Sequence, residues 1–229
     1  MKQQSPRHAP AAFIRANTWL AAPPLLPEIR LYLARDAFGL WERIEHDTGQ
    51  AQLPPPFWAF PWAGGQALAR YLLDHPGCVR GRSVLDLASG SGLVAIAAAA
   101  AGAAPVTPSE TDPLAAAAIA LNARVNRVRL EPVRGDLLDD SRAADVAPAD
   151  PVQADVILAG DAFYDRAMAG LMLPFLERAS QAGALVLVGD PGRAYLPRDR
   201  FEQVTTYDVP VERVIEDTEV KTTTVWRLR

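Results

Sequence analysis

Short apolar runs alternate with amphipathic or alanine-rich stretches along most of the chain. After residue 62 this pattern predicts a helix near residues 65–73, a strand over 83–87, a helix over 92–101 and a strand that ends at Glu110. Single strands separated by single helices are typical of βα crossovers. The alternation therefore predicts an α/β fold built on a mostly parallel, doubly wound sheet.

The same alternation continues toward the C-terminus. Asp112 and Pro113 form an N-cap and first-turn pair that predicts the start of a helix. A third strand is expected to end at Asp136, and the polar stretch 139–153 is predicted to be an exposed loop. The remaining predicted elements are a buried strand over 155–159, a helix over 165–180, a buried strand over 184–189, and two β-branched strands over 201–208 and 221–228 that close the sheet antiparallel.

The N-terminal part of the chain has a different texture. Nine of the twenty prolines lie in the first 61 residues. A short helix over residues 11–22 and a strand over 29–35 are predicted between the proline clusters. We expect residues 1–62 to form an irregular cap that belongs to the same domain as residues 63–229.

Composition narrows the class of protein. A chain of 229 residues fits one large α/β domain. The single cysteine, Cys78, cannot form a disulfide framework or a thiolate metal site, and the three histidines lack metal-ligand spacing, so no metal is predicted. The formal charge of −4 disfavours a nucleic-acid partner, because neutralising phosphates requires a basic excess.

One uncharged stretch, residues 87–109, is long enough to span a bilayer. Glycines and prolines interrupt it, and alanine contributes little to membrane insertion, so it is predicted to be a turn, a helix and a strand. The first residues show no secretory pattern. We therefore expect a cytoplasmic protein without a membrane partner, and we expect it to be a monomer.

The strongest local motif is SVLDLASGSGLVA, a strand that runs into a glycine-rich turn and a helix. Gly90, Gly92 and Ala95 fit the dinucleotide pattern, and Glu110 lies twenty residues beyond Gly90, where a ribose-binding acid is expected. Asp86 argues against a dinucleotide, because a carboxylate at the strand end would repel a pyrophosphate. It would instead favour the cationic ammonium and sulfonium of S-adenosylmethionine.

Three acids lie beyond this turn. Glu110, at the tip of the adjacent strand, is predicted to accept hydrogen bonds from the ribose hydroxyls. Asp136 either meets the adenine amino group or is a solvated carboxylate at a strand end. Asp112 is expected to be only a helix cap.

The motif set resembles that of the class I S-adenosylmethionine-dependent methyltransferases. The stretches FWAFPWAGGQALARYLLD, LAGDAFYD, GDPGR and TTTVW are similar to those of the lysine methyltransferases that modify the β-subunit of electron transfer flavoprotein. The resemblance covers most of the chain from Phe57 to Trp226. It implies a seven-stranded, Rossmann-like sheet with helices on both faces, and S-adenosyl-L-homocysteine as the product.

The resemblance also assigns residues. An acid-x-x-aromatic motif after the fourth strand falls on Asp161 and Tyr164, which are expected to be the catalytic pair. The cofactor pocket is expected to be lined by Trp62, Ala88, Ser89, Gly90, Glu110, Leu137 and Gly160. Two departures are visible: Ala88 stands where glycine is commoner, and Pro105 and Pro108 flank the second strand and remove backbone donors.

Methyl transfer to lysine requires a neutral amine, which at pH 7 costs about 4.6 kcal/mol for a lysine of pKa about 10.4. Our hypothesis is that Asp161 holds and orients the ε-amine of the substrate lysine, while Tyr164 forms one wall of the channel that this lysine enters. The alternative for Asp161 is that it caps the following helix, a role that Asp165 fits better. The alternative for Tyr164 is that it has only a packing role. Asp190 and Arg193 either shape the substrate rim or form an internal ion pair.

Other functions remain in competition. The nearest is a methyltransferase of ribosomal protein L11, which has a similar cofactor turn. A nicotinamide-dependent oxidoreductase is disfavoured by Asp86, and a non-catalytic cofactor-binding protein is disfavoured by the intact Asp161 and Tyr164 pair.

Overall fold

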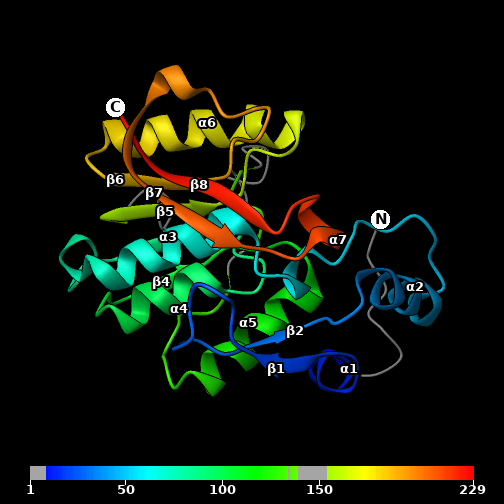
Figure 1. Ribbon diagram of the computed structural model, residues 1–229. Helices are drawn as coiled ribbons and strands as arrows, with labels where there is room; N and C mark the ends of the chain where they lie inside the picture. The colour runs from blue at the N-terminus through cyan, green and yellow to red at the C-terminus, as the bar shows by residue number, and fades with distance from the viewer. Residues whose placement is uncertain (1–8, 134, 139–153) are drawn as a thin grey trace.

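The computed structural model describes residues 9–133, 135–138 and 154–229. Its main sheet has six strands in the order β4-β3-β5-β6-β8-β7 (Figure 1). These are β3 (Val84–Leu87), β4 (Val106–Pro108), β5 (Val156–Gly160), β6 (Leu185–Asp190), β7 (Phe201–Pro210) and β8 (Val220–Leu228). The first four are parallel, and β8 runs antiparallel to both β6 and β7. The predicted mostly parallel α/β sheet is confirmed.

The strand expected to end at Asp136 is not formed among the described residues, which contribute six strands to the main sheet where seven were expected. The segment still runs beside β4, because the Glu131 N–H donates to the Val106 carbonyl at 2.8 Å. Pro108 in β4 has no N–H group with which to extend a ladder. The predicted loop over 139–153 lies outside the described residues.

Helices cover both faces of the sheet, as predicted (Figure 1). One face is covered by α3 (Ala63–Asp74) and α4 (Leu93–Ala100), and α5 (Pro113–Val125) lies beyond them; the other face carries α6 (Arg166–Gln181). The predicted caps are confirmed: Asp112 accepts from the Leu114 N–H at 2.8 Å, and Asp165 accepts from the Met168 N–H at 2.9 Å. Short helices are η2 (Pro76–Cys78), η4 (Arg198–Arg200) and α7 (Arg213–Glu216).

The N-terminal segment differs most from its prediction. It contains α1 (Pro10–Asn17), an antiparallel pair of β1 (Trp19–Ala21) and β2 (Leu31–Leu33), α2 (Ala37–Thr48) and η1 (Phe57–Ala59). The helix predicted to reach residue 22 ends at Asn17, and β2 pairs with β1 and not with the main sheet. The helix α2 was not predicted, although Asp36 caps its start and a left-handed Gly49 ends it.

The N-terminal segment packs on the core rather than standing apart. Phe13 and Ile14 of α1 are buried in one cluster with Leu114 and Ala118 of α5. Within the described ranges, no helix is both long and apolar enough to cross a bilayer.

Candidate active site

A cavity of about 700 Å³ opens where the carboxyl ends of β3, β4 and β5 meet, within the range of about 300–1,000 Å³ that ligand pockets occupy. In the strand order, β4 lies on one side of β3 and β5 on the other. Ligands of open α/β sheets bind at such a reversal point. The N-terminal segment supplies the opposite wall through Ile44, Thr48 and residues 53–58.

Most of the predicted site residues line this cavity: Trp62, Ala88, Gly90, Glu110, Asp136, Leu137, Gly160, Asp161 and Tyr164. Asp86, Ser89 and Gly92 do not appear on its surface. The Ser89 hydroxyl donates to the Asp86 carbonyl at 2.7 Å, and Gly92 precedes α4 with a φ of 79°, where an added Cβ would meet Ile119 at 3.1 Å. Ser89 and Gly92 therefore shape the turn from behind.

Asp86 is placed differently from the expectation that it faces a bound cation. It is buried, and its Oδ2 accepts from the Ala95 N–H at 3.1 Å in the first turn of α4. Burial raises the pKa of Asp86 to about 7, although hydrogen bonds from Ser89 and from the Ala95 N–H act to lower it. Any effect of Asp86 on a ligand therefore acts across the turn, without direct contact.

Glu110 lies at the tip of β4 and is fixed by backbone donors. Its Oε2 accepts from the Gly90 N–H at 2.9 Å, and its Oε1 accepts from the N–H groups of Thr111 and Asp112 at 2.7 and 3.2 Å. A carboxylate has about four acceptor positions, so a further donor can still be bound. Asp136 is exposed on the cavity wall, and its carboxylate accepts from the Leu138 N–H at 3.0 Å.

Asp161 follows β5 directly and has a φ of 61°, an uncommon backbone conformation for a residue with a side chain. It is 6% exposed. Its Oδ2 accepts from the Gly64 N–H at 2.8 Å, and its Oδ1 accepts from Arg193 Nε at 2.5 Å. Burial raises the pKa of Asp161, and Arg193 opposes that rise. Because Gly64 lies in the first turn of α3, Asp161 also satisfies an unpaired N–H at that helix start.

Close backbone contacts between glycines set this geometry. A Cβ added to Gly64 would lie under 3.0 Å from the Gly189 carbonyl oxygen, and one added to Gly160 would lie 2.9 Å from the Gly65 Cα. The start of α3 can therefore approach the ends of β5 and β6 only because these positions lack side chains. Sequence signals of this contact do exist, and sequence reasoning missed them. They are Gly64 and Gly65 in WAGGQ, Gly160 in AGD and Gly189 in VGD.

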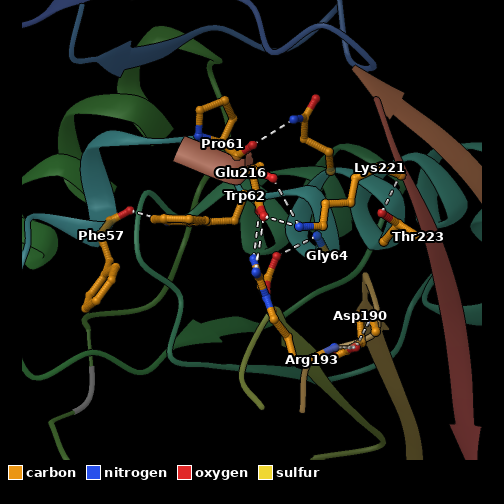
Figure 2. Close-up of polar contacts among 12 residues, drawn as sticks. Phe57, Pro61, Trp62, Gly64, Asp190, Arg193, Glu216, Lys221 and Thr223 are labelled. Atoms are coloured by element: carbon orange, nitrogen blue, oxygen red, sulfur yellow. Dashed lines mark hydrogen bonds and ion pairs between the residues drawn. The ribbon is translucent and has the colours of Figure 1, made fainter. Parts of the chain in front are cut away.

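Three aromatic side chains, those of Phe57, Trp62 and Tyr164, line the cavity together. The Tyr164 ring, 44% exposed, lies 5.3 Å from the Phe57 ring, which lies 5.8 Å from the Trp62 ring. Trp62 Nε1 donates to the Phe57 carbonyl at 2.8 Å (Figure 2). Phe57 was not predicted as a site residue, although it begins the FWAFPW motif. Burial raises the pKa of Tyr164, so its hydroxyl stays protonated at neutral pH.

Arg193 connects the site to the C-terminal hairpin, which consists of β7, α7 and β8 (Figure 2). Its two terminal nitrogens donate to Glu216 at 2.7 and 3.1 Å, and Lys221 Nζ lies 3.0 Å from the same carboxylate. The Asp190 carboxylate accepts from the N–H groups of Gly192 and Arg193 at 2.6 and 2.7 Å. Arg193 therefore forms internal ion pairs, with Asp161 and Glu216, and it also lines the cavity; its place at a substrate rim stays a prediction.

Comparisons with known proteins decide the family. A family model described as ribosomal protein L11 methyltransferase (PrmA) matches residues 67–160. The chain is 35% identical over 224 residues to the electron transfer flavoprotein beta subunit lysine methyltransferase of Rattus norvegicus, covering 94% of this chain and 82% of the relative. The corresponding protein of Xenopus laevis is 38% identical over 196 residues, covering 84% and 74% of the two chains.

The chain belongs to the electron transfer flavoprotein β-subunit lysine methyltransferase family. Among solved structures, the T. thermophilus 16S rRNA methyltransferase (RsmC), in complex with AdoMet and guanosine, aligns with a TM-score of 0.54 and 17% identity. The alignment covers 93% of this chain and 50% of that chain, and it shows a shared fold.

The charged side chains that line the cavity determine which kind of nucleotide ligand this methyltransferase favours. Its described lining includes four carboxylates, those of Glu110, Asp112, Asp136 and Asp161, and one cationic side chain, that of Arg193. Arg193 is already paired with two acids. Such a wall fits a nucleoside that carries a positive charge and disfavours a pyrophosphate. Among the residues that the structure places, no group of His, Cys, Asp and Glu could hold a metal ion.

Proposed function

We propose that this methyltransferase binds S-adenosylmethionine in the cavity and methylates lysine side chains of the electron transfer flavoprotein β-subunit. The acidic lining beside the buried Asp161 is the single observation that carries the proposal. The substrate is the one in the names of the relatives that match most of the chain.

Within this proposal the cofactor residues have distinct tasks. The fixed Glu110 carboxylate holds the ribose hydroxyls, and the backbone of Ala88 and Gly90 allows the ligand to approach β3 closely. Leu137 and Asp136 lie where the base would be held, and Trp62 forms an apolar wall. When bound, S-adenosylmethionine supplies an electrophilic methyl group: the N–C bond forms as the C–S bond breaks, and the sulfur keeps the electron pair.

The catalytic pair acts on the incoming lysine. Asp161 offers a carboxylate oxygen at a fixed position, because Gly64 and Arg193 restrain the side chain. Tyr164 and Phe57 exclude water from the amine, and loss of water favours its neutral form. The proton leaves to solvent before the amine is enclosed, and the methylated ammonium retains its charge.

The test uses the purified β-subunit, S-adenosylmethionine and this protein, with methylated lysines mapped by peptide mass spectrometry. We expect mass increases of methyl units on lysine with the wild type. Because Asp161 touches the amine, Asp161→Asn should lower kcat at least about 100-fold, the scale of losing one aligned catalytic contact. Methylation elsewhere than on lysine, or undiminished turnover by Asp161→Asn, would contradict the proposal.

A second candidate substrate is ribosomal protein L11, because the L11 methyltransferase model matches residues 67–160. That match covers the cofactor turn and β5 but stops before Asp161 and Tyr164. Purified L11 is therefore tested in the same assay. A higher kcat/KM for L11 than for the flavoprotein β-subunit would reverse the order of the two candidates.

A further inference from the structure

Arg193 lies between the catalytic carboxylate and a second buried acid. Its Nε donates to Asp161, and its two terminal nitrogens are taken by Glu216, which is 4% exposed. Lys221 pairs with Glu216 from β8 (Figure 2). Negative and positive groups thus alternate from the cavity wall to β8 through Asp161, Arg193, Glu216 and Lys221.

This alternation matters because a lone aspartate would work against the reaction. An opposite charge within about 4–6 Å favours the charged form of a group, by about 1–3 pKa units. An unpaired Asp161 would therefore hold lysine as the ammonium, which has no lone pair. The other ionisable groups near Asp161 or its partners are Asp190 at the end of β6, Glu110 and the Tyr164 hydroxyl. Glu216 also acts on Asp161, and among the described groups around Asp161 the cation in contact with it is Arg193.

The geometry leaves Asp161 able to accept a further donor. Arg193 approaches through Nε, so only one of its donors is used on Asp161, and Gly64 occupies one position on Oδ2. Each carboxylate oxygen therefore keeps one acceptor position. The Arg193 guanidinium also lies 5.9 Å from the Trp62 ring centre, so it is held against the cavity wall by an aromatic face.

We propose that Arg193, anchored by Glu216, is a positioning residue that cancels the charge of Asp161, so that Asp161 accepts a hydrogen bond from lysine without stabilising the ammonium. The inference rests on the proposed function. It makes the C-terminal hairpin, through Glu216 and Lys221, part of the support of the site.

The test is the pH profile of kcat for lysine methylation by wild type, Arg193→Gln and Arg193→Lys. Arg193→Gln removes the cation, so the acid limb should move to higher pH by about one unit or more, with kcat near pH 7 falling about 10-fold. Arg193→Lys restores a cation and should keep its acid limb within about half a unit of wild type. Arg227→Gln, which removes an arginine from an exposed pair with Glu202, should leave the profile unchanged.

A second measurement keeps the inference testable if Arg193→Gln loses turnover altogether or if the wild type does not methylate the β-subunit. Carboxyl-carbon NMR of aspartates follows the titration of Asp161 directly, and its pKa should rise by about one unit or more in Arg193→Gln, because the neighbouring cation that opposes the rise is lost. A wild type inactive on lysine would overturn the proposed function. An unshifted Asp161, or acid limbs that coincide for wild type and Arg193→Gln, would overturn the role of Arg193.

Discussion

Two non-glycine residues of the site adopt positive φ, Ala88 at 51° and Asp161 at 61°. Such conformations cost about 1–3 kcal/mol and persist where the surroundings hold them. The sequence marked both positions, Ala88 by its departure from glycine and Asp161 by its motif. It could not indicate the strain itself, because φ depends on how β3 and β5 end against their neighbours.

The position of Asp86 could be predicted from the motif, but the direction of its side chain could not. The sequence predicted a carboxylate at the end of β3, and one is there. The direction of that carboxylate, into the first turn of α4, depends on the side-chain rotamer and on the Ala95 N–H. No spacing rule contains that information.

The raised pKa of Asp86 predicts a pH-dependent stability. Its folded value of about 7 lies above the unfolded value of about 3.9. The stabilisation is therefore present below pH of about 4 and is lost as the pH rises toward 7. Relative to wild type, Asp86→Asn should gain free energy of unfolding across this range, by up to about 1.4 kcal/mol per pH unit.

Urea unfolding of both proteins at several pH values between about 4 and 8 measures this difference. Asp199→Asn, at an exposed position of η4, is the matched control and should give a curve parallel to that of wild type. A difference between wild type and Asp86→Asn that does not vary with pH would show that Asp86 titrates normally.

At the scale of elements, the contact between α3 and the strand ends is the one that the site depends on. Gly64→Ala places a Cβ against the Gly189 carbonyl oxygen, where backbone must move. We expect a loss of about 2 kcal/mol or more in the free energy of unfolding, as for other overpacked cores. Methylation should fall as well, because the Gly64 N–H restrains Asp161.

Gly170→Ala is the control for this change. It lies in α6, and an added Cβ would meet no atom within 4 Å. Replacing glycine by alanine in a helix interior should stabilise by about 0.5–1 kcal/mol. Thermal and urea unfolding separate the two variants, and equal effects at both positions would contradict the close approach of α3.

The strength of local patterns explains which elements could be predicted. Apolar runs and caps located β3, β5, β6, α5 and α6, because those signals are contained within the segments themselves. The helix α2 was not predicted, although Asp36 and Gly49 mark its ends, because only Leu40 and Ile44 of its 12 residues are buried and its apolar pattern is weak. The strand expected to end at Asp136 is not formed among the described residues for a different reason: pairing beside β4 depends on an N–H group that Pro108 lacks.

At the scale of the whole molecule, the cavity joins parts of the chain that are far apart in sequence. Residues 53–58 of the N-terminal segment face the ends of β3, β4 and β5, and Arg193 ties the site to Glu216 in α7. The resemblance named Asp161 and Tyr164 as the expected catalytic pair, and both line the cavity with most of the cofactor residues that it implied. The pairing of Arg193 with Glu216 could not be predicted, because 23 residues separate them and no pattern links them.

The central claim is that this cavity holds a cationic methyl donor, and calorimetric titration tests it most directly. S-adenosylmethionine should bind the wild type one to one, and NAD should not bind. Glu110→Ala should weaken S-adenosylmethionine at least about 10-fold, since hydrogen bonds to a charged group contribute about 1.5–3 kcal/mol. Binding of NAD without binding of S-adenosylmethionine would contradict the account.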